Sequence, residues 1–254
     1  MKEQKIKIAH SLKKIRVFPD DIVMIHGDAG ISAQFSHIEI KNRPKELVRQ
    51  IIQYFYPHGT IVIPSFSYSF TNGEDFDVKN TPGAVGKFSE EFRLYPHNSI
   101  GRSNHPIFSV SGLGKHFKKF EKSRIDDCFG EDTAFDLLYK LNGKIVLLGC
   151  DFESTTFVHY VEQSFGVSYR FMKKFSGFLI KNNKKVPFTT SYNVRKLDVK
   201  TDLNLLKKKL IRHKKLFTSK IGRFEILSVK AKDFFNCSIE LMKSNKFALI
   251  KNAV

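Results

Sequence analysis

The chain has 254 residues, of which 41% are hydrophobic and 27% charged, a balance typical of a globular protein with one large core. No apolar run approaches the roughly 18 residues of a membrane span, and the first residues lack the apolar core of a secretory signal. Three cysteines, Cys128, Cys150 and Cys237, form an odd count without metal-ligand spacing. We therefore expect reduced thiols, a cytoplasmic location, no metal site and no membrane span.

The net charge of +18 is concentrated in the last third of the chain. Residues 171–254 hold 21 Lys and Arg against 5 Asp and Glu, whereas residues 1–170 hold 22 against 20. Part of this excess is expected from an AT-rich genome, which favours lysine codons. A basic excess attracts anions through its long-range field, but the charge alone does not say which anion.

Strands and helices are predicted to alternate over most of the chain. Short apolar runs rich in β-branched residues predict buried strands, and apolar residues at three- and four-residue spacing predict helices. In chain order the predicted elements are a helix over 2–16, a strand over 22–25, a helix over 44–56, a strand over 59–64, a polar loop over 71–86, a helix over 88–94, an extended segment over 108–111, helices over 113–120 and 134–141, and a strand over 145–148.

The last third differs from this pattern. A hairpin is predicted over 177–192 with its turn at 181–185, followed by a basic amphipathic helix over 202–213. The earlier strand–helix alternation predicts an α/β fold with a mainly parallel central sheet and helices on both faces, a three-layer αβα architecture. We expect 1–170 to form this core and 171–254 to form a basic α+β extension packed on it within one continuous domain.

The strand over 145–148 leads into the stretch with the clearest chemical signal. Gly149 permits a sharp exit from the strand, and ligands bind outside the carboxyl ends of strands in open α/β sheets. The next segment is predicted as a helix that carries His159 and Glu162 on one face, three residues apart. A histidine polarised by a carboxylate is a ready general base, although the same pair also occurs as a purely structural contact.

Two other strand ends carry residues of interest. Residues 26–30 hold two glycines that suit a close backbone approach to a ligand, but they form no complete phosphate-binding fingerprint. Residues 65–70 alternate Ser with Phe or Tyr. This alternation predicts either a pocket wall with hydroxyls on one side, or an extended segment whose rings pack in the core. The sequence leaves both interpretations open.

Six groups of residues occur in a fixed order between positions 20 and 165. They are Ile25-His26; Gly59 to Ser67; Thr81-Pro82-Gly83 with Gly86 and Glu91-Phe92-Arg93; Arg102 to Pro106 with Ser109; Phe129-Gly130; and Gly143 to Gly149 leading to Thr156, His159 and Glu162. In this order they resemble the aminoglycoside 3-N-acetyltransferase-like family of acyl-coenzyme A-dependent N-acyltransferases. That family includes enzymes that acylate nucleotide-linked amino sugars. The sequence departs from the family pattern at Gly27-Asp28, where small hydroxyl residues are usual.

The resemblance implies direct transfer of an acyl group from acyl-coenzyme A to an amine. Such a reaction needs a proton removed from the amine and an oxyanion stabilised. The resemblance implies His159 as the base, Glu162 as the partner that fixes its tautomer, and Thr156 as a hydrogen-bond donor. The residues expected to bind the coenzyme are His26, Ser32, Ser65, Ser67, Arg102, Ser103, His105 and Ser109. Those expected to bind the amine substrate are Tyr68, Asp77, Asp126 and Asp127.

Two other side chains compete with His159 for a chemical role. Pro106 forces an extended conformation on His105 and holds its imidazole on a rigid loop, which also suits a purely structural part. Cys150 stands where a nucleophile could form an acyl-enzyme. Small neutral cysteines at strand ends more often fill apolar space, and the family's implied mechanism is direct transfer, so we expect no covalent intermediate.

The sequence says less about the amine. Aminoglycosides are polycations that need an acidic pocket, whereas a nucleotide-linked amino sugar is anionic through its pyrophosphate and suits the basic last third. We therefore predict a nucleotide-linked (dTDP-type) amino-dideoxy sugar for surface polysaccharide as the substrate. The transferred group is expected to be acetyl or a short hydroxyacyl group. Aminoglycoside 3-N-acetylation, which confers antibiotic resistance, is the alternative.

A different class of function is a basic nucleic-acid-binding protein. Lys207–Lys209 and Arg212–Lys215, with Phe217 nearby, supply a basic face with an aromatic residue. The chain lacks a recognition motif, so no nucleic-acid partner is expected. An esterase that uses a serine with His159 is disfavoured because no Gly-x-Ser-x-Gly elbow occurs. A homo-oligomer is compatible with the sequence, which does not fix the oligomeric state.

Overall fold

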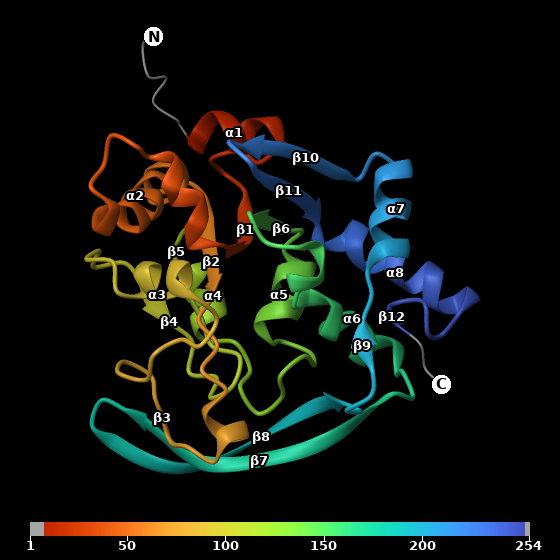
Figure 1. The fold of residues 1–254 in the computed structure, drawn as a ribbon. Coiled ribbons are helices and arrows are strands. Elements are labelled where there is room, and N and C mark those ends of the chain that lie inside the picture. The colour runs from red at the N-terminus through yellow and green to blue at the C-terminus, as the bar shows by residue number, and fades with distance from the viewer. Residues whose placement is uncertain (1–7, 252–254) are drawn as a thin grey trace.

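A seven-stranded sheet forms the centre of the computed structural model, which describes residues 8–251 (Figure 1). The strand order is β10-β11-β6-β1-β2-β5-β4. The bounds are β1 Ile22–Gly27, β2 Thr60–Pro64, β4 Gly101–Arg102, β5 Val110–Gly114, β6 Lys144–Leu148, β10 Leu216–Ile221 and β11 Phe224–Lys230.

The three central strands, β6, β1 and β2, run parallel, and the strands outside them pair antiparallel. A parallel pair needs a crossover connection, and the helix between β1 and β2 supplies one. β10 and β11 are instead joined by a two-residue turn at 222–223, which permits only an antiparallel pair. The predicted α/β fold is therefore confirmed, with its parallel part at the centre of the sheet.

Helices cover both faces of the sheet. On one face lie α1 (Ile8–Lys14), α2 (Arg43–Phe55) and α3 (Lys87–Arg93). On the other lie α4 (Phe117–Glu121), α5 (Ala134–Lys140), α6 (Phe157–Phe165) and α8 (Ala231–Ser244), with α7 (Asn204–Arg212) packed on α8 and β10.

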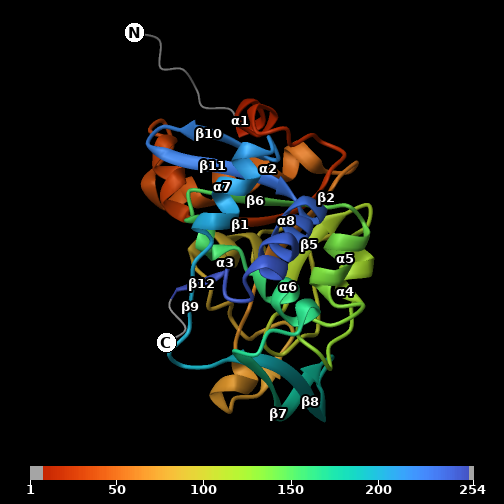
Figure 2. The same ribbon diagram turned by 90° about the vertical axis from the view of Figure 1, so that its right-hand side faces the viewer.

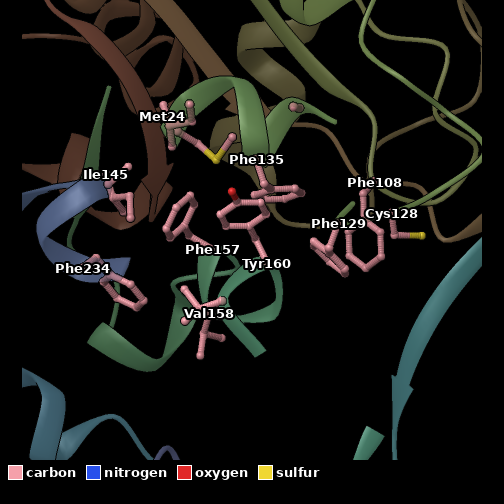
Figure 3. Packing of buried hydrophobic residues seen from close by; sticks show 14 of the residues in the cluster. Met24, Phe108, Cys128, Phe129, Phe135, Ile145, Phe157, Val158, Tyr160 and Phe234 are labelled. Carbon is pink, nitrogen blue, oxygen red and sulfur yellow. The ribbon is translucent and has the colours of Figure 1, made fainter. Parts of the chain in front are cut away.

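The alternation of side chains along each strand divides the core into two clusters. Val23 and Ile25 of β1 pack with the α1–α3 layer, and Met24 between them packs with the other layer. Figure 3 shows this second cluster, in which the rings of Phe157 and Tyr160 from α6 lie below Met24. The β-branched and aromatic strand residues are thus buried on both faces, as expected for a three-layer αβα fold.

A long hairpin crosses one end of the molecule, away from the central sheet (Figures 1 and 2). It consists of β7 (Arg170–Lys181) and β8 (Lys184–Arg195), with the short β3 (Phe76–Asp77) paired to β7. Asn182 and Asn183 form the turn, both with positive φ, which asparagine tolerates better than most residues. The predicted hairpin is confirmed and is longer than expected.

Some predicted boundaries are wrong. The helix predicted over 113–120 starts only at Phe117, because β5 extends to Gly114. Gly112 explains the difference: a Cβ there would lie 2.1 Å from the carbonyl oxygen of Ile61, a close strand contact that only glycine allows. The loop predicted over 71–86 contains β3, and residues 2–7 of the first predicted helix lie outside the described residues.

The last third of the chain completes the central sheet. β11 pairs with β6 over five residues, so the edge of the parallel core is covered by strands from the basic extension. α8 then packs against α6 and α5. The division into 1–170 and 171–254 stays a prediction. Among residues 8–251, no helix is both long and apolar enough to cross a membrane.

Candidate active site

A cleft of about 310 Å³ opens at the carboxyl ends of the three parallel strands. This position is the one at which open α/β sheets bind ligands. The residues that line it come from the last residues of β1 and β2, from the loops after β2 and β6, and from α3 and the residues just before it. They are His26, Gly27, Pro64, Phe66, Tyr68, Val85, Ser89, Cys150, Ser154 and Thr156.

Backbone geometry at the strand ends creates room for this cleft. A Cβ at Gly27 would lie 2.4 Å from the ring of Phe88, so the loop after β1 can pass α3 only with glycine. Gly149 leaves β6 with φ +77°. Tyr68 also has a positive φ of 57°, which is uncommon for an aromatic residue and often marks a functional position.

The serines and aromatic residues after β2 point in different directions. The rings of Phe66 and Tyr68 line the cleft, while the hydroxyl of Ser67 donates to the carbonyl oxygen of Pro106 at 3.0 Å. Ser65 is fully buried and accepts from the hydroxyl of Ser111 at 3.0 Å. The alternation therefore forms a cleft wall of rings, with the hydroxyls on the buried side.

Four side chains form a compact charged cluster at α6. His159 Nδ1 lies 3.2 Å from Glu162 Oε2, as the three-residue spacing predicts. Arg170, the first residue of β7, places Nη2 2.6 Å from the same carboxylate oxygen and 2.6 Å from His159 Nδ1. Tyr169 donates its hydroxyl to Glu162 Oε1 at 3.0 Å. The Glu162 and Arg170 side chains are fully buried, whereas His159 retains 15% of its exposure.

This environment keeps His159 neutral and Glu162 ionised at neutral pH. Burial lowers the pKa of His159 to about 4, and the Arg170 charge acts in the same direction, although the hydrogen bond to Glu162 opposes both. Burial alone raises the pKa of Glu162, but the hydrogen bond with His159 and the Arg170 charge outweigh it and lower that pKa. The pKa of His159 therefore lies well below the ordinary histidine value of about 6.5.

The two contacts at His159 Nδ1 require different tautomers. An arginine can only donate, so the Arg170 contact needs a lone pair on Nδ1 and places the proton on Nε2. The Glu162 contact needs the proton on Nδ1, which leaves Nε2 free to accept one. Only this second arrangement makes His159 a general base through Nε2. Arg170 and Glu162 thus favour opposite tautomers of His159.

Four other side chains of interest lie in or beside the cleft. Thr156 lines it and precedes α6, with His159 one helical turn further along. The hydroxyl of Thr155, fully buried, and His26 Nε2 both lack hydrogen-bond partners among the described residues. Cys150 also lines the cleft, but burial raises the pKa of its thiol to about 12. A thiol that stays protonated at neutral pH is a poor nucleophile, which agrees with direct transfer.

Most residues assigned to the coenzyme form a buried network behind the cleft. Arg102 donates to the carbonyl oxygens of Ser65 at 2.7 Å and Thr81 at 2.5 Å, and to the hydroxyl of Ser109 at 3.1 Å. Ser103 accepts from the backbone of Val110 at 3.0 Å. Arg102 therefore ties β4 and β5 to the loop after β2. None of these groups lines the cleft among the described residues, and their coenzyme role stays a prediction.

His105 and Ser32 are likewise held by internal contacts. His105 Nδ1 accepts from the backbone N–H groups of Ile107 and Phe108 at 3.1 and 3.0 Å, which places its proton on Nε2. Burial lowers the pKa of His105 to about 4. Ser32 donates to the carbonyl oxygen of Ala29 at 2.6 Å. These contacts fit a structural role, and binding of the coenzyme by either residue stays a prediction.

The carboxylates proposed for the substrate are occupied by partners of their own. Asp126 pairs with Arg124 at 2.6 Å, and Asp77 accepts from the backbone N–H groups of Lys79 and Asn80. Asp127 accepts from Gln163 Nε2 of α6 at 3.0 Å. Tyr68 alone among the four proposed substrate residues lines the cleft. The described lining of the cleft contains no carboxylate.

Arg170 and Tyr169 were not predicted from the sequence. Lysines and arginines are usually solvated, so nothing in the local pattern marks Arg170 as buried. The available signal was its position eight residues after Glu162 and seven residues before the predicted hairpin. The chain turns back along α6 between Phe165 and Arg170, and this turn brings Arg170 into contact with His159.

Three buried histidines should make the protein sensitive to mild acid. Burial lowers the pKa values of His26, His105 and His159 to about 4, below the value of about 6.5 in an unfolded chain. The unfolded state then binds more protons between pH 6.5 and 4, so the free energy of unfolding falls as pH falls through that window. Each histidine should lower the free energy of unfolding by about 2 kcal/mol between pH 7.5 and pH 5.

Urea denaturation at the two pH values measures this effect. We expect His105→Gln to reduce the pH-dependent loss by about 2 kcal/mol. His58→Gln, which changes an exposed histidine, serves as the control and should leave the loss unchanged. Equal pH dependence in both variants would show that His105 keeps an ordinary pKa of about 6.5 in the folded protein.

YokD of Bacillus subtilis (strain 168) is similar to this chain in sequence and in structure. It is described as an SPbeta prophage-derived aminoglycoside N(3')-acetyltransferase-like protein and is 27% identical over 139 residues, 46% of this chain and 50% of the relative. The matched region thus spans about half the length of this curated relative. The YokD crystal structure has a TM-score of 0.77, with 20% identity, covering 94% of this chain and 93% of that one.

Two other solved structures share the fold. AAC-IIIb, in a binary complex with CoASH, has a TM-score of 0.78 at 15% identity, covering 93% of this chain and 95% of that one. Sisomicin-bound AAC-VIa has a TM-score of 0.79 at 19% identity, covering 95% and 98%. At these identities the similarity establishes the fold.

The family assignment comes from the sequence itself. The model of the aminoglycoside 3-N-acetyltransferase family matches residues 31–243, well over half of the chain. The matched range contains the strand ends that form the cleft after β2 and β6, together with the cluster of His159, Glu162 and Arg170. The predicted resemblance is confirmed: the chain belongs to the aminoglycoside 3-N-acetyltransferase family.

Proposed function

We propose that this protein is an N-acyltransferase that moves an acetyl or short acyl group from acyl-coenzyme A to the amine of an amino sugar. The observation that carries the proposal is the His159–Glu162 pair on α6, one helical turn beyond the cleft-lining Thr156. The family supports the reaction class. The complex of AAC-IIIb with CoASH supports coenzyme A as the co-substrate.

The residues of the cluster suit attack of an amine on a thioester. The amine nitrogen forms a bond to the thioester carbonyl carbon, the carbon–sulfur bond breaks, and the amine loses one proton. His159 takes this proton at Nε2 when Glu162 holds the proton on Nδ1. Thr156 supplies a hydroxyl at the cleft, and the proton finally leaves with the coenzyme thiol. The amide and the free thiol are the two products.

Two kinds of observation bear on the identity of the amine substrate: the ligands of the relatives and the residues that line the cleft. Relatives are described in complexes with sisomicin, apramycin and gentamicin, which makes an aminoglycoside the first substrate to test. The comparisons do not support the nucleotide-linked sugar that we predicted partly from the range of the family and partly from charge. The cleft lining nevertheless lacks a carboxylate for a polycation, and Asp126 is already paired. A less cationic amino sugar, including a nucleotide-linked one, is therefore the second candidate.

A thiol-release assay tests the reaction and the substrate together. We expect free thiol to appear only when acetyl-coenzyme A and an amino sugar are both present. Aminoglycosides with one to five amines and nucleotide-linked amino sugars should be compared at equal concentration with several acyl donors, and products identified by mass. Equal thiol release without any sugar would contradict acyl transfer and indicate a thioesterase.

A further inference from the structure

A second pocket, of about 320 Å³, lies at the amino end of the central strand β6, opposite the end at which the cleft opens. Lys144 at the start of β6 and Lys230 at the end of β11 line it, and these two residues are paired across the strands. The start of β10 and the segment after α1 complete its walls, and Figure 2 shows α1 beside β10. We call it the basic pocket.

Cations dominate this pocket. Five of its lining residues are Lys or Arg, namely Arg16, Lys144, Lys214, Lys215 and Lys230. Lys144 pairs with Asp21 at 2.5 Å, and Lys215 pairs with Asp233 at 2.9 Å. Across residues 8–251, no carboxylate pairs with any of the other three. The pocket therefore carries an uncompensated positive charge, which attracts an anion.

Two of the unpaired cations sit on strained backbone. Arg16 has φ 55° and Lys214 has φ 56°. Each follows a helix and closes it: the N–H of Val17 reaches back to Leu12, and the N–H of Lys215 to Leu210. Glycine is the usual residue at this position because other residues pay a steric cost there. A basic side chain at both positions, directed to one pocket, indicates a role beyond ending the helices.

Aromatic rings adjoin these charges. The Arg16 guanidinium lies 4.3 Å from the ring centre of Phe217, and the Lys144 ammonium lies 5.2 Å from that of Phe18. Phe18 is 46% exposed. Phe18 thus offers an exposed flat ring for stacking at the basic pocket, whose unpaired cations offer charge for phosphate groups.

We propose that the basic pocket binds a small ligand of nucleotide type, with two or more phosphates facing Arg16, Lys214 and Lys230 and a flat ring on Phe18. The volume suits a ligand of this size. The pocket is separate from the cleft, because it lies at the amino end of β6 and the cleft lies at the carboxyl end. The site thus goes beyond the proposed acyl transfer.

Titration calorimetry with ATP in EDTA, at saturating coenzyme A, tests the site. The double variant Arg16→Gly with Lys214→Gly removes two cations at positions where glycine relieves strain, so the variant should remain folded. We expect it to weaken ATP binding at least tenfold while thiol release stays unchanged. Pyrophosphate should bind more weakly than ATP, and adenosine should not bind.

A control variant removes the same charge elsewhere. Lys208→Gln with Lys243→Gln changes two exposed lysines outside the pocket and should alter ATP binding less than twofold. If ATP binding weakens equally in both double variants, the loss follows from the net charge of the protein and the proposal is wrong. Loss of ATP binding on adding coenzyme A, together with equal ATP affinity of the wild type and the Arg16→Gly, Lys214→Gly variant without the coenzyme, would place the nucleotide at the coenzyme site instead. If a 12-nucleotide RNA binds more tightly than ATP and displaces it, the pocket binds nucleic acid, and the proposal of a small ligand is wrong.

Discussion

His159→Asn should lower the turnover number by about 10²–10⁴-fold, the usual contribution of a positioned general base. Asparagine keeps a polar side chain of similar size but has no basic nitrogen that can take the amine proton. The affinity for the coenzyme should change little, because His159 lies beyond the residues that line the cleft. Steady-state kinetics with the best amine, together with calorimetry for coenzyme A, separates the two quantities.

The exposed His58 provides the matched control, since His58→Asn changes the same side chain far from α6 and should leave turnover unchanged. A second measurement is the pH profile of kcat/KM for the wild type. With its pKa near 4, His159 stays deprotonated above pH 5.5, so its titration should produce no acid limb between pH 5.5 and 7. Near-normal turnover of His159→Asn would remove His159 from the base role.

The sequence predicted the parts of the site that depend on local spacing. His159 and Glu162 are brought together by one turn of helix, and the strand ends that form the cleft follow from short apolar runs and glycines. These features need no knowledge of distant contacts. The parallel centre of the sheet is predictable for a similar reason, because alternation of strands and helices is typical of a parallel α/β sheet.

Roles that depend on which partner a charged side chain meets in the folded protein could not be predicted from the sequence. The family resemblance implies that Arg102 binds the coenzyme, yet folding brings the carbonyl oxygens of Ser65 and Thr81 to it. Asp126 reads as part of an acidic pocket, yet Arg124 pairs with it from two residues away. A sequence shows which charged side chains are present, but not which of them form ion pairs with each other.

Arg170 is the clearest instance of such a contact and the source of the second large effect. Arg170→Met should lower the free energy of unfolding by about 3–5 kcal/mol, because it leaves the fully buried Glu162 carboxylate without its cation. The same change frees His159 Nδ1 to donate to Glu162 alone. Urea denaturation measures the first effect, and nitrogen-15 NMR of labelled histidine measures the tautomer.

The loss should grow with pH. Without Arg170, burial is expected to raise the pKa of Glu162 above its unfolded value, so the buried carboxyl contributes stability when protonated and loses it as pH rises through the raised pKa. The destabilisation should therefore be larger at pH 8 than at pH 5. Arg124→Met, which breaks an exposed arginine–carboxylate pair of similar geometry, is the control and should cost at most about 1 kcal/mol.

The double variant Arg170→Met with Glu162→Gln distinguishes a buried ion pair from simple loss of packing. If the unpaired carboxylate causes the destabilisation, removing its charge should restore most of the lost stability, and the two single effects should not add. Additive losses would show that Arg170 contributes through its alkyl chain and through its 2.8 Å hydrogen bond to the carbonyl oxygen of Asn193. In that case Arg170 would hold the two strands of the hairpin together without setting the state of His159.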